Sequence, residues 1–486
     1  MNFHIIKRTI GWLLLFEAIF FIVPIITAIV YSEVEIVSFL AAMSICIALG
    51  IVCLLGKPKS EYMYAKEGFV IVALSWIVMS IFGALPFWFS GTIPSFMDAL
   101  FETVSGFTTT GATIFPKTVS LDALPKSMII WRSFTHWIGG MGVLVLIMAF
   151  LPLSGARNMH IMRAESPGPT VGKLVPRVKT TALVLYSIYL VMTIVQLVML
   201  LFGDMSFFEA LNCAFSTAGT GGFSWNSKSI NDYSSYVQII ITVFMLLFSI
   251  NFNSYYLVLR SKLKDAFTTE VRAFFIIVFV AITAIALNVY FVPGEGYSYS
   301  VGEAIKQSAF SVASIISTTG FATNNFDLWP AFSKAILVIL MFIGACAGST
   351  GGGIKISRWL ILGKGALYEL KMMLHPKQVR KISVDKRPVD GETVRAVGSY
   401  LIAYIFIYAI SLLIILLDCP DLETSFSAIA ATINNVGPGL GQVSPEGTFA
   451  FFSNTSKLVF IFDMLAGRLE VFPMILLFTP ATWKKQ

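Results

Sequence analysis

Long apolar stretches with few charges recur along the whole chain, and they constrain its fold more than any other feature. A helix needs about 20 apolar residues to cross the hydrocarbon core of a membrane. Ten stretches reach or approach that length, namely 9–32, 36–56, 68–97, 133–156, 180–203, 233–259, 273–294, 335–354, 396–417 and 458–483. Charged residues make up only 13% of the chain, about half the fraction in soluble domains. The sequence therefore predicts an all-α polytopic membrane protein.

The basic residues indicate how such a chain is oriented. If the N-terminus is cytoplasmic and the spans alternate, most of the 34 lysines and arginines fall in cytoplasmic segments, as the positive-inside rule requires. An even number of spans then places both termini in the cytoplasm. The net charge of +7 is explained by this topology, so we expect no nucleic-acid partner. Docking of a soluble protein on the basic loops is the alternative reading of the same charges.

Four connections on the outward side share a second pattern. Each carries an apolar stretch too short to cross the membrane, followed by a loop centred on Gly111, Gly222, Gly320 or Gly437. The two residues before each glycine are Thr109 and Thr110, Thr220 and Gly221, Thr318 and Thr319, and Asn435 and Val436. A small residue stands six positions before each glycine: Ser105, Ser216, Ser314 and Ala431. Gly219 offers another register for the second loop, but Gly222 aligns better with the third loop.

This pattern predicts a fourfold internal repeat of span, short pore helix, loop and span. The repeats occupy 68–156, 180–260, 271–358 and 394–482, with two additional spans in 1–60 and cytoplasmic loops at 157–179 and 359–393. Repeats of this kind determine the architecture of a protein. We expect the four units to be pseudo-symmetric around one ion pore.

Glycine-centred loops suit an ion pathway for physical reasons. Irregular backbone at membrane depth is tolerated where it lines an aqueous cavity or is buried in protein. Converging carbonyls can replace the hydration shell of an ion, and glycine permits the backbone to turn them inward. The partially negative C-terminal ends of the short helices would favour a cation. Each loop alone could be a simple turn, but four in register favour an ion filter.

A gate is predicted beneath these loops. Five glycines lie within residues 344–353 of the third repeat, and they should break its second span. The candidate gate residues there are Gly348, Ser349, Thr350, Gly351, Gly352 and Gly353. The GxxxxGK[ST] pattern of a phosphate-binding loop is absent, whereas a plain packing break remains an alternative.

Arg468 and Glu470 complete the candidate gate. Charged residues within a span are costly and are functional candidates by default. Because the two are only two positions apart, they do not share a helix face, and each should find a partner on another element. A structural ion pair is the alternative reading for Arg468. Asp463 and Arg132 are interpreted as structural residues or as residues near the outer end.

At these residues the sequence resembles the Trk/Ktr/HKT superfamily of potassium transporters, specifically its TrkH branch. The matching motifs are TTTGAT at 108–113, RAESPGP at 163–169, GGFS at 221–224, STTGFAT at 317–323, CAGSTGGG at 346–353, NNVGPGLG at 434–441 and GRLEVF at 467–472. The resemblance implies that carbonyls of the two residues before each loop glycine coordinate potassium. It also implies that Gly111, where plant sodium transporters of this superfamily carry serine, favours potassium, and that Arg468 helps close the pore.

The resemblance implies further partners. They are membrane lipid, a second copy of the chain in a homodimer, and a TrkA-type nucleotide-binding ring docking on basic loops such as 157–179 and 359–395. Nucleotide would then act only through that separate subunit. No covalent cofactor is expected, and potassium is the only metal ion implied, at the loop residues. The implied location is the bacterial inner membrane.

Two other function classes are alternatives to a potassium channel-like subunit. A secondary transporter coupling potassium to protons or sodium would need intramembrane acids, and Glu17 is an isolated candidate. An enzyme would need a nucleophile with its base, paired acids or a metal-ligand cluster, and the sequence contains no such pattern. The scattered cysteines are interpreted as small buried hydrophobic residues.

Overall fold

A computed structural model describes residues 1–55, 65–142, 178–292, 297–375, 382–385 and 387–484. Most of these residues are helical, so the prediction of an all-α polytopic membrane fold is confirmed. Within the described ranges, the strands form a small hairpin of β1 (Ser383–Val384) and β2 (Arg387–Pro388). The predicted cytoplasmic loop 157–179 lies almost wholly outside the described residues.

The helices follow one another in the order of the repeats. The N-terminal group is α1 (Phe3–Phe20), α2 (Ile22–Val30) and α3 (Ile36–Leu54). The first two repeat groups are α4 (Ala65–Phe89), α5 (Phe96–Phe107) and α6 (Lys126–Gly140), then α9 (Val178–Leu201), α10 (Phe207–Gly219), α11 (Ser235–Phe248), α12 (Phe252–Leu259) and α13 (Leu263–Ala266). The last two are α14 (Thr269–Phe291), α15 (Val301–Ile316), α16 (Ala331–Ile343) and α17 (Ile356–Leu374), then α18 (Gly391–Ile415), α19 (Leu422–Ile433), α20 (Asn454–Arg468), α21 (Phe472–Phe478) and α22 (Pro480–Trp483).

Fewer helices cross the membrane unbroken than the apolar stretches predict. Among the described residues, six are long and apolar enough, with α1 and α2 counted together, and the pair α11–α12 makes a seventh if counted as one span. That pair is bent by 91°. Neither of the stretches 233–259 and 458–483 forms one unbroken helix, because α11 ends at Phe248 and α20 ends at Arg468.

The helix that follows the glycine loop in every repeat is short, with 13 to 15 residues in each of α6, α11, α16 and α20. The ends of α6 and α16 coincide with glycine-rich stretches, whereas those of α11 and α20 do not. After α20 the chain turns through Glu470 and Val471, whose φ angles are +60° and +67°, values that a β-branched residue rarely adopts. The stretch predicted at 133–156 continues beyond α6 into residues outside the described part.

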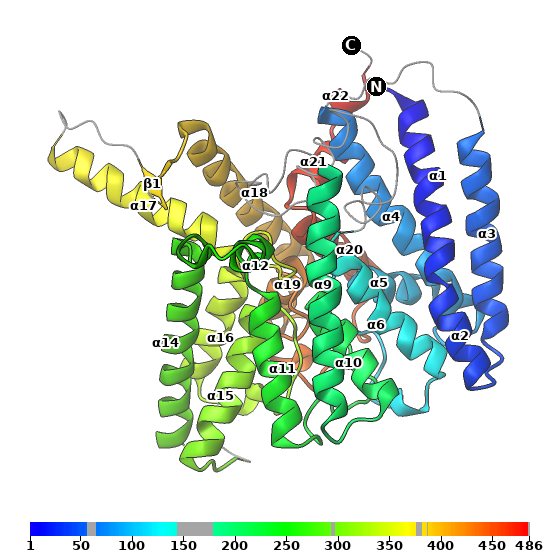
Figure 1. Cartoon of the computed structure of the whole chain (residues 1–486), viewed down its shortest axis with the longest axis horizontal. Coiled ribbons are helices and arrows are strands. Elements are labelled where there is room, and N and C mark those ends of the chain that lie inside the picture. Colours follow the sequence, from blue (N-terminus) through cyan, green and yellow to red (C-terminus); the bar gives the residue numbers. More distant parts are fainter. Residues whose placement is uncertain (56–64, 143–177, 293–296, 376–381, 386, 485–486) are drawn as a thin grey trace.

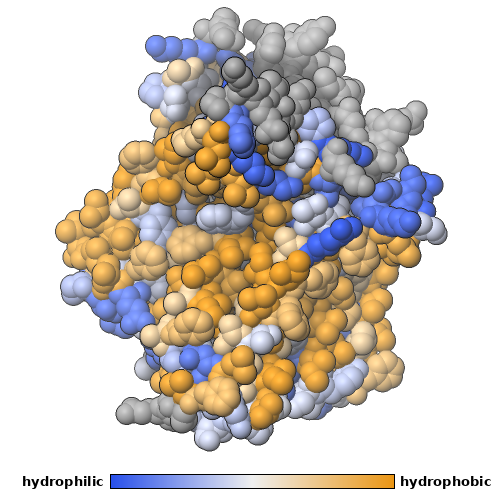
Figure 2. Space-filling view, turned by 90° about the vertical axis from the view of Figure 1, so that its left-hand side faces the viewer, coloured by the Kyte–Doolittle hydropathy of each residue, from blue (hydrophilic) through white to orange (hydrophobic). Residues whose placement is uncertain are grey.

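The outside of the molecule carries the apolar surface that a membrane requires. Figure 2 shows apolar side chains over most of the middle of one face, with hydrophilic ones gathered in its upper part and in smaller groups toward its lower edge. On α14, for example, Ile276, Phe279 and Val280 are well exposed. Exposed apolar surface on this scale indicates contact with lipid or with another apolar partner.

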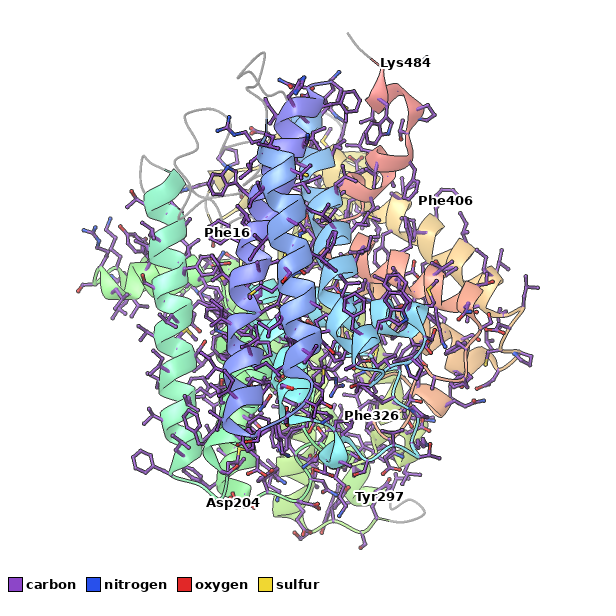
Figure 3. All side chains as sticks on the ribbon, turned by 90° about the vertical axis from the view of Figure 1, so that its right-hand side faces the viewer. Phe16, Asp204, Tyr297, Phe326, Phe406 and Lys484 are labelled. Atoms are coloured by element: carbon purple, nitrogen blue, oxygen red, sulfur yellow. The ribbon has the colours of Figure 1, made fainter. Side chains whose placement is uncertain are left out.

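The two ends of the chain lie on the same side. The ring of Phe3 stacks on that of Trp483, with 6.2 Å between their centroids. Lys484 lies at the opposite end of the molecule from Asp204 and Tyr297, which belong to loops that precede short helices (Figure 3). The N-terminal helices α1 and α3 pack together at one edge, next to α4 (Figure 1).

Candidate functional site

Four short helices, α5, α10, α15 and α19, run into the four glycine-centred loops. Each begins with an N-cap whose side chain accepts a backbone N–H, namely Ser95, Ser206, Ser300 and Asp421. Each is buried over its C-terminal half. The hydroxyl of Thr424 donates to Asp421 and lowers the pKa of that exposed carboxyl. Capping at the outer end fixes the helices, so that their C-terminal ends point inward.

All four helices end with the same hydrogen bonds. The residue before each loop glycine donates its N–H to the carbonyl of the small residue six before that glycine, over 2.8–2.9 Å. The donors are Thr110, Gly221, Thr319 and Val436, and the acceptors are Ser105, Ser216, Ser314 and Ala431. This is a Schellman ending. The residue two before each glycine is left-handed, with φ of 57°, 56°, 59° and 55° at Thr109, Thr220, Thr318 and Asn435.

Left-handed threonine and asparagine are uncommon, because the conformation costs roughly 1–2 kcal/mol for an L-residue. The same strained conformation occurs four times in loops of different sequence. The surrounding structure must therefore impose it, and the repeated turn directs the carbonyls of the loops.

The four loop glycines form a closed ring. Their φ values are 80°, 75°, 82° and 97° at Gly111, Gly222, Gly320 and Gly437. A Cβ added to any of them would collide with a carbonyl oxygen of the next repeat. The oxygens met in turn belong to Gly221, Thr319, Val436 and Thr110, so the fourth repeat leads back to the first. Gly222 belongs to this ring, whereas Gly219 is the last residue of α10.

Hydroxyl and amide groups support the loops from behind. The hydroxyls of Thr108 and Thr110 are 2.8 Å apart, and those of Ser317 and Thr319 are 2.6 Å apart. Asn435 joins the fourth loop to the first, because its Nδ2 donates to the Thr110 hydroxyl over 2.9 Å. Such a scaffold leaves backbone carbonyls as the groups available to a dehydrated cation.

The stretch 344–355, called the intramembrane loop below, lies directly against two of these glycine loops. The N–H of Gly352 donates to the Thr318 hydroxyl over 2.6 Å, and that of Gly353 donates to the Asn434 carbonyl over 3.1 Å. A Cβ on Gly351 would come within 2.9 Å of the Ser317 carbonyl oxygen. Lys355, at the end of the loop, is buried and bonds back to the Gly351 carbonyl.

Neighbouring elements hold the rest of the intramembrane loop. The Thr350 hydroxyl donates to the Phe248 carbonyl at the end of α11 over 3.1 Å. The N–H of Phe252 donates to the Gly348 carbonyl over 3.0 Å, and the Ser349 hydroxyl donates to the Cys346 carbonyl over 2.7 Å. The intramembrane loop therefore packs against the break between α11 and α12.

Arg468 and Glu470 find partners on other elements, as expected from their spacing. Arg468 donates to the Thr350 carbonyl over 2.9 Å and to the carbonyls of Gly139 and Gly140 over 2.6 and 2.5 Å. Glu470 forms an ion pair with Arg358, in the first turn of α17. Arg468 thus ties the end of α6 to the intramembrane loop.

Sequence reasoning missed two buried acids beside the site. Glu102 on α5 forms a fully buried ion pair of 2.7 Å with Arg132 on α6 and accepts the N–H of Ile114 over 2.8 Å. Arg132 also donates to the Ser224 carbonyl over 3.1 Å, so it is a structural residue of the loops. A glutamate in the middle of the short pore-helix stretch, a full turn beyond the capping residues, was the available signal.

The second missed acid is Glu270, in the first turn of α14. Its Oε1 accepts the N–H of Ala347 over 2.8 Å and the N–H of Ser357 over 3.0 Å. These donors lie near the two ends of the intramembrane loop. Its sequence position, next to basic residues at the start of a span, resembles an ordinary helix start and does not predict this role.

Comparison with known proteins decides the family. A family model for TrkH cation transport proteins matches residues 35–485. The chain belongs to the TrkH family. Among relatives, the Trk system potassium uptake protein TrkH of Escherichia coli K12 is 35% identical over 491 residues, covering 100% of both chains. That of Vibrio parahaemolyticus is 36% identical over 497 residues, again covering 100% of both.

A solved structure agrees with this TrkH assignment. The crystal structure of the potassium transporter TrkH from Vibrio parahaemolyticus matches with a TM-score of 0.88, 34% identity and coverage of 100% of both chains. The predicted family and polytopic fold are therefore confirmed. The relatives are named as potassium uptake proteins, so the chain belongs to a family of transporters rather than enzymes, as predicted. Among the described residues, no group of three or more His, Cys, Asp or Glu side chains could hold a metal ion.

Proposed function

We propose that this TrkH-family chain mediates potassium uptake through a channel-like pore. Full-length relatives at 35–36% identity carry the name of potassium uptake proteins. The observation that carries the proposal is the closed ring, in which each loop glycine lies against a carbonyl of the next repeat. Such a ring presents several carbonyls from four directions, which is the arrangement that replaces the water around a monovalent cation.

The filter in this proposal consists of the ring glycines and the two residues before each. These are Thr109, Thr110, Gly111, Thr220, Gly221, Gly222, Thr318, Thr319, Gly320, Asn435, Val436 and Gly437. The backbone is left-handed at each ring glycine and at the residue two positions before it. In this proposal, these turns direct successive carbonyls toward one axis. The C-terminal ends of α5, α10, α15 and α19 add partial negative charge around a cation held there.

The gate in this proposal is the intramembrane loop, with Arg468 as its latch. The loop lies against the third and fourth glycine loops, and Arg468 holds its Thr350 carbonyl. A guanidinium beneath the ring repels a passing cation at short range. Glu470 and Arg358 hold the start of α17, so movement of α17 would pull on the loop.

The surroundings of the pore follow from the same proposal. The chain resides in the bacterial inner membrane with both termini in the cytoplasm, in line with its two ends lying on one side (Figure 1). It works as a homodimer with a cytoplasmic TrkA-type nucleotide-binding ring, in line with the Trk system named for its relatives. Nucleotide acts through that ring, the chain itself carries no covalent cofactor, and potassium is the transported ion.

Coupling of potassium to protons or sodium is the second candidate. It is favoured by one observation: both carboxylate oxygens of the buried Glu17 lack a hydrogen-bond partner among the described residues. An intramembrane carboxyl of this kind can take up a proton. The two candidates differ in what drives uptake.

The deciding experiment is ⁸⁶Rb⁺ uptake into proteoliposomes containing this chain alone, with potassium or sodium as competitor. For a gated filter, potassium blocks uptake and sodium does not, Gly320→Ser weakens this discrimination, and Arg468→Ala raises uptake. Uptake that requires an imposed proton or sodium gradient and ignores both substitutions would replace this proposal with the coupled transporter.

A further inference from the structure

The second glycine loop lacks two side chains that the first and third loops possess. In those loops the residues one and three before the ring glycine carry hydroxyls that contact each other: Thr108 with Thr110, and Ser317 with Thr319. In the second loop both positions are glycine, Gly219 and Gly221. Its backbone conformation is nevertheless the same as in the other loops.

The backbone does not require glycine at either position. Gly219 lies at the end of α10, and neither glycine is among the residues with positive φ. What excludes a side chain there is space. A Cβ on Gly219 would meet the backbone of His136, and a Cβ on Gly221 would lie on the imidazole ring of His136.

His136 comes from a different repeat. It lies on α6, the helix that follows the glycine loop in the first repeat, and is completely buried. Its ring stacks on Phe223, the residue after the ring glycine, with 4.3 Å between centroids and 23° between planes. One turn earlier on the same helix, the Arg132 guanidinium lies 4.1 Å from the Phe223 ring centroid. The helix thus contacts the second loop through two side chains that lie one turn apart, Arg132 and His136.

The imidazole contributes shape rather than polarity. Neither ring nitrogen has a hydrogen-bond partner among the described residues. A flat ring packed on a loop backbone fixes its position through close contact, since tightly packed interiors resist even small changes of volume.

We infer that His136 is a specificity-determining positioning residue for the second loop. It supplies from the first repeat the wall that threonine and serine side chains supply within the first and third loops. This inference rests on the proposed filter, and it explains why the sequence STAGTGGFS contains three glycines where one would satisfy the backbone.

A double-mutant cycle tests the inference, with ⁸⁶Rb⁺ uptake under potassium and sodium competition as the readout. Gly221→Ala places a methyl group on the imidazole, so discrimination against sodium should fall about tenfold, the effect of roughly 1.4 kcal/mol. His136→Ala removes the wall and should lower discrimination less. In the double variant the methyl group has room, so discrimination should recover by at least about threefold over Gly221→Ala alone, as expected for residues in contact.

Two controls make the cycle decisive. Phe134→Ala removes a larger ring from the same helix, where it contacts Trp137 and Phe215 instead of a glycine loop; it should lower thermal stability without changing discrimination. Should Gly221→Ala yield no folded protein, recovery of folded protein in the double variant is the same supporting result.

Additive effects of the two substitutions, with no recovery of discrimination or of folded protein, would overturn the role of His136. Failure of the underlying filter has a different signature, because then Gly320→Ser would also leave discrimination unchanged.

Discussion

The four glycine loops and the four helix ends beneath them differ in how well they keep the fourfold repeat. In the loops, backbone angles agree within a few degrees at the left-handed residue and within 22° at the ring glycine. Beneath them, α6, α11, α16 and α20 share little except that each stops after 13 to 15 residues. The four repeats thus share their backbone geometry at the ring and differ in the layer of helix ends below it.

One pair of glycines shows where the repeat diverges. Gly139 on α6 lies against the Phe107 carbonyl, and Gly467 on α20 lies against the Ile433 carbonyl, four residues before the ring glycine in each case. The next residue is Gly140 in the first repeat and Arg468 in the fourth. The positively charged Arg468 therefore occupies one of two equivalent positions, and its guanidinium donates to the carbonyl of Gly140 at the other. Four repeats in one chain permit this asymmetry, which identical subunits could not provide.

The largest expected effect on ion discrimination comes from breaking the ring. Alanine at any one of Gly111, Gly222, Gly320 or Gly437 combines a left-handed backbone with a carbonyl clash, so potassium over sodium discrimination should fall at least about tenfold. Competition of ⁸⁶Rb⁺ uptake by the two ions measures it. Gly302→Ala is the matched control, because no atom lies within 4 Å of its added Cβ. Normal discrimination in two or more of the ring variants would contradict equivalence of the four loops.

The largest expected effect on stability concerns the buried ion pair of Glu102 and Arg132, whose glutamate has no counterpart in the other three repeats. Nine residues before the ring glycine stand Glu102, Cys213, Ser311 and Ala428. Glu102→Gln leaves Arg132 buried without its counter-charge, which should cost about 3–5 kcal/mol of folding stability. Thermal unfolding of the purified protein in detergent measures this loss. Ser311→Ala, at the equivalent site in the third repeat, should be far milder, and equal losses would show that the pair has no special role.

A smaller effect is expected beneath the ring, at Glu270. Its carboxylate accepts N–H groups near both ends of the intramembrane loop, and this contact is called the clamp below. Glu270→Gln keeps an acceptor for Ala347 and Ser357 but removes the charge, weakening the clamp by about 1 kcal/mol. Basal ⁸⁶Rb⁺ uptake without a regulatory subunit should therefore rise about threefold to fivefold, with unchanged ion discrimination. Glu303→Gln, in the capping box of α15, is the control. Altered discrimination in Glu270→Gln would mean that the clamp acts on the filter instead.

The smallest effect lies at the outer end of α19. Asp421 caps this helix, and its pKa is lowered by the Thr424 hydroxyl, so its contribution is present at neutral pH and is lost as the pH falls through its folded value. Asp421→Ala should lower the unfolding midpoint by about 1–2 °C at pH 7. This difference should shrink on acidification. A difference that grows at low pH would contradict the assigned ionisation.

The glycine loops could be predicted from the sequence because their geometry depends on local residues. A short apolar stretch, a small residue six positions before a glycine and the register of four copies are all visible in the chain. The break after α16 could be predicted for the same reason, because glycines produce it. These features can be recognised without knowing which segments meet in space.

The remaining features depend on contacts between distant segments. The break between α11 and α12 contains neither glycine nor proline, and Asn251 stabilises it by capping α12. In the sequence, His136 is one more residue of an apolar helix, and its role becomes visible only from its contact with the second loop. The partners of Arg132 and Glu270 likewise lie on other helices or loops, and no spacing within one helix could reveal them.

The stacking of Phe3 on Trp483 has a practical consequence for the connectivity of the chain. Since the first and last described helices meet on one side, a short flexible linker could join them, and new ends could be opened in an exposed connection elsewhere. A circularly permuted chain would place the four repeats in a different order of synthesis while keeping every contact around the axis. Such a chain would separate what the order of the repeats contributes to assembly from what their packing contributes to the finished pore.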